Sequence, residues 1–247
     1  MSITLNGPLV LIGAGKMGGA MLSGWLARGL DPRQVFVQDP GPPPEVAALL
    51  KQHNIEVHAT LPASMPEPAV LLIAVKPQVM EDVFPPVARR AGPSTVVLSI
   101  AAGRTIASFA KHLPKTTAII RSIPNTPAAV GRGITVCCPN PHVTASQRIL
   151  ATELLSAIGQ VGWVEDEALI DTATAVSGSG QLTCSCWPSA WLMLALRRAS
   201  MRSLHANSQM QPFQDPASCC DLAAKIRRSC AGTSHRPTAR PLQPSRF

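Results

Sequence analysis

The sequence lacks the features that mark a membrane or an exported protein. It has no run of about 18 consecutive apolar residues, so we expect no membrane-spanning helix. Its first residues do not combine a basic segment, an apolar segment and a small-residue cleavage site, so we expect no secretory signal and a cytoplasmic location. Charged residues are scarce at 15%, whereas hydrophobic residues reach 46%. This balance allows a substantial core in one large domain or two smaller ones.

Basic residues and cysteines are concentrated at one end of the chain. Residues 1–180 contain 13 Lys/Arg and 12 Asp/Glu, whereas residues 181–247 contain 9 and 2, so the net charge of +8 belongs mostly to the C-terminal segment. That segment has few aromatics and no groove-reading helix pattern, so we expect no nucleic-acid or membrane partner. Its cysteines lack the two separated pairs of a zinc site, so we expect free thiols and no metal. They are Cys184, Cys186, Cys219, Cys220 and Cys230.

Short apolar runs alternate with stretches of helical periodicity. Continuous apolar strands that alternate with helices are typical of a parallel sheet covered on both faces, so we predict an α/β, doubly wound, Rossmann-type domain over residues 1 to about 124. The predicted strands are 9–13, 35–37, 70–75, 95–100 and 117–120, and the helices are 16–29, 45–53, 78–90 and 105–112. An extension, residues 125–165, adds strands at 134–137 and 160–164 around a helix near 145–157. A further helix begins within residues 166–176.

A glycine-rich loop follows the first predicted strand and opens the first predicted helix. Gly13-Ala14-Gly15-Lys16-Met17-Gly18 matches G-x-G-x-x-G, the dinucleotide-binding pattern. Gly13 permits the tight turn, Gly15 lets the backbone approach a pyrophosphate, and Gly18 allows close helix–strand packing. The helix N-terminus adds unpaired N–H groups for the phosphates. The alternative is a tight strand–helix turn without a ligand.

Asp39 ends the second predicted strand, about 21 residues after Gly18. An acid at this position can accept hydrogen bonds from the adenosine ribose and repel a 2′-phosphate, which favours NAD over NADP. A cap of the turn before Pro40 explains the same residue equally well. The sequence therefore leaves the choice between NADH and NADPH open.

Four more segments lie at the carboxyl ends of predicted strands or on the loops after them, where open α/β sheets bind ligands. With the glycine-rich loop, and in this order, they closely resemble pyrroline-5-carboxylate reductases over residues 8–180. One departure is Ile123, where the family usually has Met. The segments are Ala74-Val75-Lys76-Pro77, Ser99-Ile100-Ala101-Ala102-Gly103, Ile123-Pro124-Asn125-Thr126-Pro127 and Ser177-Gly178-Ser179-Gly180.

The resemblance implies hydride transfer from NADPH or NADH to the imine carbon of 1-pyrroline-5-carboxylate, which gives L-proline. The cofactor carries this chemistry and the protein aligns the reactants, so no strong side-chain acid is required, and we assign no catalytic side chain. Glu167 is a weaker candidate for substrate binding, since it could instead belong to a solvated, acid-rich first helical turn. Lys76 could equally be a surface charge. The implied cofactor contacts are Ile12, Gly13, Ala14, Gly15, Lys16, Met17, Gly18, Asp39, Ala74, Val75, Lys76, Pro77, Ala101, Ala102, Gly103 and Asn125.

The resemblance ends abruptly after Gly180. The family continues with Pro-Ala-Tyr and a long helix of its homo-oligomerisation domain, which also contributes to the substrate pocket. This chain continues with Gln181-Leu182-Thr183-Cys184. One codon assignment for residues 181–201, with a single C restored before it, encodes the family-like helix P-A-Y-V-F-L-L-A-E-C-L-A-D-A-G-V-E-A-G-L-H. We therefore hypothesise a lost nucleotide near codon 181.

The predicted organisation is a Rossmann domain with its extension at residues 1–165, the start of the helical dimerisation domain at 166–180, and an aberrant, disordered basic tail at 181–247. Because the dimerisation domain is replaced, we do not expect efficient turnover or the family's oligomer. Two other functions fit the front half of the chain. It could be a nucleotide-binding fragment without catalysis, or a reductase of another imine or a hydroxy acid.

Overall fold

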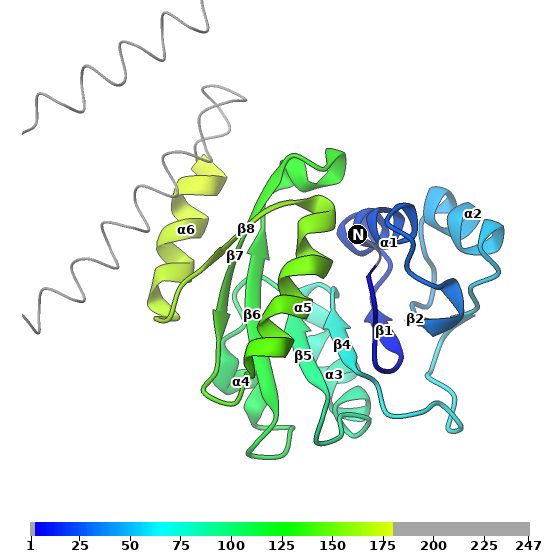
Figure 1. Ribbon diagram of the computed structural model, residues 1–247, viewed down its shortest axis with the longest axis horizontal. Helices are drawn as coiled ribbons and strands as arrows, with labels where there is room; N and C mark the ends of the chain where they lie inside the picture. The colour runs from blue at the N-terminus through cyan, green and yellow to red at the C-terminus, as the bar shows by residue number, and fades with distance from the viewer. Residues whose placement is uncertain (1–2, 180–247) are drawn as a thin grey trace, which may run out of the picture. The chain divides into compact units, whose positions relative to one another are not determined.

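The structure is a computed structural model that describes residues 3–179 (Figure 1). Its strands are β1 (Leu9–Ile12), β2 (Val35–Gln38), β3 (Val57–His58), β4 (Val70–Ile73), β5 (Val96–Ser99), β6 (Ala118–Pro124), β7 (Gly133–Pro139) and β8 (Gly159–Trp163). Its α-helices are α1 (Lys16–Ala27), α2 (Pro44–Gln52), α3 (Met80–Ala88), α4 (Ile106–Ala110), α5 (Ala145–Leu155) and α6 (Ala168–Ser179). Short 3-10 turns are η1 (Pro32–Gln34), η2 (Pro77–Val79), η3 (Thr126–Val130) and η4 (Ser156–Ile158).

The strands form one eight-stranded sheet in the order β3-β2-β1-β4-β5-β6-β7-β8. The chain moves outward from β1 to β3 and then crosses to β4, which pairs with the other side of β1 in parallel. The strand order therefore reverses between β1 and β4, the point at which doubly wound sheets bind ligands. This confirms the predicted Rossmann-type fold. The two-residue edge strand β3 was not predicted from the sequence.

The predicted parallel sheet is confirmed for β1 to β6, and the antiparallel pair of β6 and β7 lies where the predicted extension begins. The strand β6 runs on to Pro124, beyond the predicted end at residue 120, and pairs antiparallel with β7. Only residues 125–132 connect the two strands, and they include the turn η3 and a left-handed Gly131 at φ 69°. A parallel connection needs a crossover of roughly a dozen residues or more. Because the link between β6 and β7 is shorter than that, β7 returns antiparallel to β6. The strand β8 then joins β7 in parallel after the crossover through α5.

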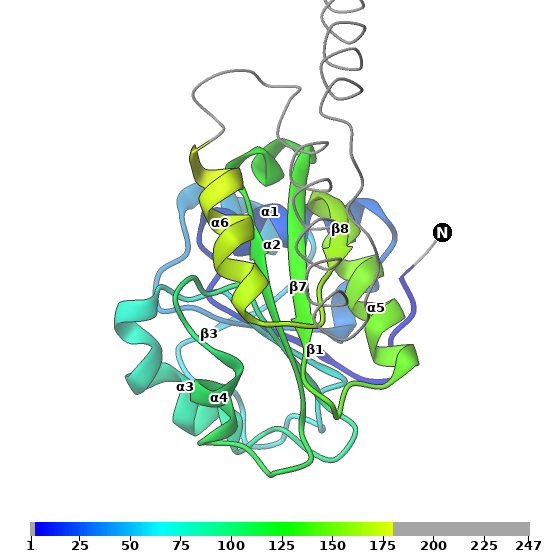
Figure 2. The same ribbon diagram turned by 90° about the vertical axis from the view of Figure 1, so that its left-hand side faces the viewer.

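Helices cover both faces of the sheet, as the continuous apolar strands predict. Leu9 and Leu11 of β1 face one side and share a core with Trp25 of α1 and Leu154 of α5. Val10, on the alternate face of β1, belongs to the second core cluster. That cluster also contains an edge-to-face aromatic pair from α3 and α4, Phe84 and Phe109, whose ring centroids lie 5.0 Å apart. Figure 2 shows α3, α4 and α6 on one side of the sheet and α5 on the other.

The helix α6 packs on the far strands of the sheet through a third apolar cluster, in which Ile170 and Ala173 meet Ile134 and Val136 of β7. Residues 177–179 belong to the end of this helix and do not follow a strand, which corrects the expectation for the Ser-Gly-Ser-Gly segment. Gly180 and the predicted tail at 181–247, with its frameshift hypothesis, lie outside the described residues. Within the described part, no helix is long and apolar enough to cross a membrane.

Candidate functional site

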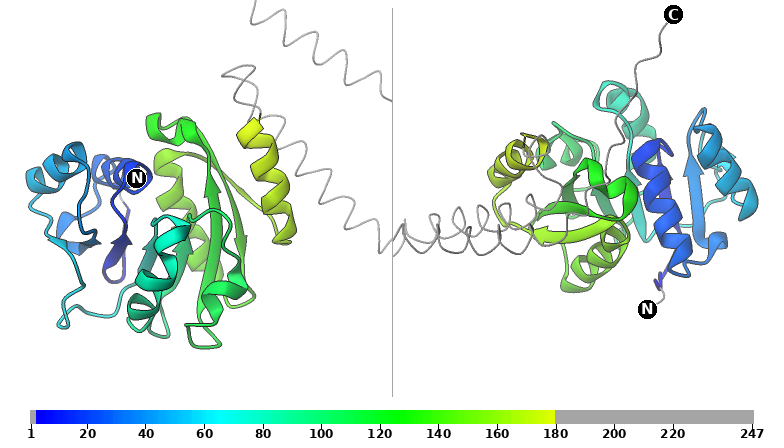
Figure 3. Two further views of the ribbon diagram at one scale, coloured as in Figure 1. Left: turned by 180° about the vertical axis from the view of Figure 1, so that it is seen from behind. Right: turned by 90° about the horizontal axis from the view of Figure 1, so that it is seen from above.

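The carboxyl ends of four strands meet at one edge of the sheet. Hydrogen bonds run one residue past the strands and hold the following loops together: Gly13 N donates to Gln38 O at 2.9 Å, and Ala74 N donates to Ile12 O at 2.7 Å. Ile100 N donates in the same way to Ile73 O at 3.0 Å. The predicted loops after β1, β2, β4 and β5 therefore start side by side at this edge, seen from above on the right of Figure 3.

Packing requires two of the glycines in the loop after β1. Gly13 has φ +91°, and a Cβ there would lie 2.8 Å from Ala74 O. A Cβ on Gly18 would lie only 2.2 Å from Gly13 O, so any side chain would push α1 away from its loop. These contacts hold the first turn of α1 against the ends of β1 and β4. The roles that the motif assigns to Gly13 and Gly18 are therefore visible as backbone contacts.

Gly15 has a different environment. Its φ is −68°, a value open to any residue, and a Cβ there would meet no atom within 4 Å. Protein packing therefore does not require glycine at this position. The missing side chain leaves open space directly at the N-terminus of α1, where a phosphate could approach the backbone.

The N-terminus of α1 has no capping partner from a side chain. Gly15 is its N-cap and supplies no side-chain hydrogen bond, and the first turn contains no acid. The first residue, Lys16, is exposed. The first N–H groups of a helix lack partners within the helix, and the helix dipole adds positive charge there. This end of α1 therefore fits the pyrophosphate of a dinucleotide.

Asp39 uses both carboxylate oxygens on backbone groups. Oδ1 accepts a hydrogen bond from Gly41 N at 2.8 Å, which is the turn cap considered from the sequence. Oδ2 accepts from Ala14 N at 2.7 Å, inside the glycine-rich loop. Asp39 thus also ties the end of β2 to that loop, a role that no short-range pattern indicates. Each oxygen keeps acceptor capacity for a ribose hydroxyl.

An arginine joins the loops after β4 and β5. Arg104 follows Gly103, and its guanidinium forms an ion pair with Glu81 and donates to Pro77 O at 2.8 Å. Nearby, Lys76 is exposed and Ala101 N donates to Ser99 Oγ at 3.2 Å. The segments Ala74–Pro77 and Ala101–Gly103 are therefore fixed relative to each other. Sequence reasoning missed Arg104; its position directly after the Ala-Ala-Gly segment was the available signal.

Asn125 follows β6 at the same edge and is buried. Its Oδ1 accepts from Ile134 N at 2.8 Å, and its own N donates to Ile134 O at 3.2 Å. These two bonds connect the start of η3 to β7. The turn η3 in turn contacts α1, so Asn125 belongs to the same group of loops as the glycine-rich segment.

Glu167 lies just before α6 and has specific partners. Its Oε1 accepts from Arg121 Nη1 at 2.9 Å and from Ile106 N, the first residue of α4, at 2.8 Å. Arg121 has only 4% of its side chain exposed, and its Nη2 reaches Asp171 of α6 at 3.1 Å. The carboxylate is therefore not simply part of a solvated first turn. A role in substrate binding stays a prediction.

Sequence reasoning also missed Arg121, whose signal is a lone charge inside the apolar strand Ala118–Pro124. The guanidinium joins β6, α4 and α6 through the carboxylates that it contacts. Its Nε is buried without a hydrogen-bond partner among the described residues. Buried charges are tolerated when they are paired in this way, so the group has a structural reason to be there.

Cys137 and Cys138 are free and buried in β7. Burial, together with the nearby acids Glu167, Glu165 and Asp166, raises the pKa of Cys138 to about 11 against the opposing effect of Arg121. Burial also raises the pKa of Cys137. Neither thiol is therefore a nucleophile at neutral pH. Among the described residues, no group of three or more His, Cys, Asp or Glu could hold a metal ion.

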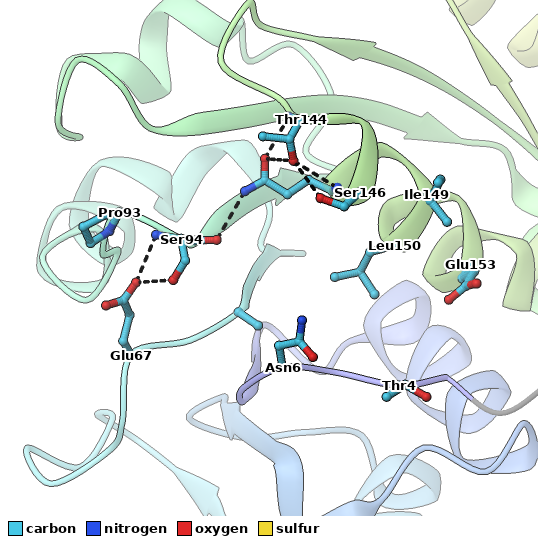
Figure 4. A pocket seen from close by; sticks show the side chains of 12 residues that line it. Thr4, Asn6, Glu67, Pro93, Ser94, Thr144, Ser146, Ile149, Leu150 and Glu153 are labelled. Atoms are coloured by element: carbon cyan, nitrogen blue, oxygen red, sulfur yellow. Dashed lines mark hydrogen bonds between the residues drawn. The ribbon is translucent and has the colours of Figure 1, made fainter.

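A hollow of about 540 Å³ lies near the opposite edge of the sheet, where β1, β4 and β5 begin. Its polar groups bind one another: Glu67 accepts from Ser94 Oγ at 2.7 Å, and Gln147 Nε2 donates to Ser94 O at 3.2 Å (Figure 4). Thr144 caps α5 at the same place. Since α/β sheets bind ligands at the carboxyl ends of their strands, this hollow is not the candidate site.

Comparisons with known proteins support the family that the sequence resembles. A family model described as NADP oxidoreductase, coenzyme F420-dependent, matches residues 8–103. A solved pyrroline-5-carboxylate reductase from Coxiella burnetii covers 91% of each chain with a TM-score of 0.66 at 23% identity. Plasmodium falciparum pyrroline carboxylate reductase, solved with NADP bound, covers 93% of each with a TM-score of 0.60 at 19% identity. These two structures establish the fold.

Sequence similarity is higher among the curated relatives. The pyrroline-5-carboxylate reductase of Pseudomonas aeruginosa is 36% identical over 172 residues, which make up 70% of this chain and 63% of that protein. The chain thus spans less than two thirds of this relative's length. The predicted resemblance is confirmed over that stretch. In these 172 residues, the chain carries a segment of the pyrroline-5-carboxylate reductase family.

Proposed function

We propose that the chain binds NADH or NADPH at the carboxyl edge of its sheet and that its reaction is the reduction of 1-pyrroline-5-carboxylate to L-proline. The main support for cofactor binding is the open space at Gly15, at the N-terminus of α1, which no side chain caps. Backbone N–H groups of Gly15 to Gly18 would hold the pyrophosphate, and Asp39 would face the adenosine ribose. The names of the curated relatives support the substrate.

A bound nicotinamide would supply the hydride. Hydride addition to the protonated imine forms one C–H bond, and the C=N π pair becomes the lone pair of the proline nitrogen. No further proton is needed in this step, so the protein's task is to align the two reactants. The fixed loops at Ala74–Pro77, Ala101–Gly103 and Asn125 would line the nicotinamide side. Glu167, beside the start of α4, is proposed to influence the substrate side through the loop after β5.

The test measures binding and turnover separately on the 247-residue chain. Isothermal titration with NADH and NADPH measures binding, and oxidation of the reduced cofactor in the presence of 1-pyrroline-5-carboxylate measures turnover. Turnover with this imine, but not with 2-hydroxy or 2-keto acids, supports the proposed substrate. Absence of binding to both cofactors would refute the proposal.

Binding without turnover is the second candidate function. The extent of the alignment favours it, since the part of the chain that aligns spans only 63% of the length of the Pseudomonas relative. We further propose that residues 181–247 arise from a shifted reading frame, because the relatives' similarity covers about 70% of the chain and one codon assignment for residues 181–201, with a single C restored, encodes a family-like helix. Sequencing the gene around codon 181, together with an intact mass of the native product, tests this. An unbroken reading frame with no family-like helix in any frame would refute it.

A further inference from the structure

We propose that the loop after β2, residues 39–44, makes this chain select NADH over NADPH, with Asp39 as the specificity-determining residue. The inference rests on the proposed dinucleotide binding and adds the choice of cofactor. The loop lies next to the glycine-rich segment, since Asp39 Oδ2 accepts from Ala14 N at 2.7 Å. Its sequence is Asp39-Pro40-Gly41-Pro42-Pro43-Pro44. The adenosine ribose of a dinucleotide on this fold lies at the end of β2.

The loop has no hydrogen-bond donor left for a phosphate. Four of its six residues are prolines, which lack a backbone N–H. Only two backbone donors remain, and both are used. Asp39 N donates to His58 O at 3.1 Å, and Gly41 N donates to Asp39 Oδ1 at 2.8 Å. No side chain of residues 39–44 carries a positive charge or a hydroxyl.

The fixed carboxylate opposes a phosphate and suits a hydroxyl. Two backbone donors, Ala14 N and Gly41 N, hold the Asp39 side chain in place, so it cannot easily turn away. A 2′-phosphate carries a charge of about −1.5 to −2 and would lie against this carboxylate. A ribose 2′-hydroxyl can instead donate to a remaining lone pair. Beside the loop, Nε2 of His58 lies 3.9 Å from the Glu56 carboxylate.

The experiment compares the dissociation constants of NADH and NADPH by isothermal titration of the full chain. We expect NADH to bind more tightly by a factor on the order of ten or more. Pro40→Arg adds a cation at an exposed position and keeps both bonds of Asp39, so it should reduce that factor at least about threefold, mainly through tighter NADPH binding. Asp39→Asn should also reduce the factor. The control Asp31→Asn removes a carboxylate before β2, at its other end, and should leave the factor unchanged.

The possible outcomes distinguish a failure of the NADH preference from a failure of dinucleotide binding itself. Equal binding of the two cofactors, or tighter NADPH binding, overturns the inference and leaves dinucleotide binding intact. Binding of neither cofactor overturns both. Thermal melting of each variant reports folding, and Pro40→Arg tests the charge argument even if Asp39→Asn loosens the glycine-rich loop. A Pro40→Arg variant with the wild-type preference would also overturn the inference.

Discussion

Two alanine substitutions in the glycine-rich loop should affect different quantities: Gly18→Ala should lower the stability of the fold, and Gly15→Ala should weaken NADH binding. In Gly18→Ala, the new Cβ would lie 2.2 Å from Gly13 O, a backbone atom that cannot move without shifting the loop. Overpacking of this kind destabilises proteins by about 1–3 kcal/mol, and we expect the upper part of that range because the obstacle is backbone. The free energy of unfolding should fall by roughly that amount.

In Gly15→Ala, the Cβ would meet no atom within 4 Å, and φ is −68°, so no clash or strain arises. Alanine restricts the unfolded chain, which stabilises by about 0.4–1 kcal/mol, but it is a poorer N-cap than glycine by a similar amount. Stability should therefore stay within about 1 kcal/mol of the wild type. The methyl group would occupy the space at the N-terminus of α1, and NADH binding should weaken at least about tenfold, equivalent to about 1.4 kcal/mol.

Urea unfolding followed by far-ultraviolet circular dichroism measures the first quantity, and isothermal titration with NADH measures the second. Gly18→Ala should lower the urea midpoint, whereas Gly15→Ala should lose binding at an unchanged midpoint. The reasoning is refuted if Gly15→Ala is destabilised as much as Gly18→Ala. It is also refuted if Gly15→Ala binds NADH as the wild type does.

Other regions allow further tests. Arg121→Met should destabilise the protein by about 3 kcal/mol in urea unfolding, because it leaves Glu167 without its buried partner. The control Arg33→Met breaks an exposed ion pair and should change the free energy of unfolding by less than about 1 kcal/mol. Equal effects of the two substitutions would contradict the role of Arg121. Peptides that carry Cys137 and Cys138 should stay unlabelled by a thiol reagent at neutral pH until denaturant is added, and mass spectrometry checks this. The folded pKa of Cys138 lies above its ordinary value of about 9, so its contribution to stability is complete below that pH and is lost as the pH rises through about 11. Cys138→Ala should flatten this alkaline loss, and an unchanged pH profile would contradict the assignment.

The sequence predicted most of the fold because the information for it is local. Apolar runs such as Val70–Ile73 and Val96–Ser99 are too short for a helix and too apolar for an exposed loop, so they predict buried strands wherever they pair. The edge strand β3, of two residues, has no such signal. The extent of β6 was underestimated because its last residues, 121–124, include Arg121 and Pro124, which interrupt the apolar pattern.

The candidate site was predictable where a motif describes its own backbone. Gly13 and Gly18 are required by contacts within one strand–turn–helix unit, and their spacing alone indicates those contacts. Asp39 was predicted with two alternatives, and the structure supports the turn cap directly through Gly41 N. Arg104 was missed, because its partners Pro77 and Glu81, in η2 and α3, follow a different strand that only the sheet brings near.

By itself, therefore, the sequence determined the alternation of strands and helices, the glycine-rich loop and the family that residues 8–180 resemble, since these depend on periodicity and short spacings. Only the tertiary structure decided which distant groups meet: Asp39 with Ala14, 25 residues apart, and Arg121 with Glu167, 46 residues apart. The physical reason is that strand order, set by the burial of both sheet faces, places residues side by side without regard to their separation along the chain.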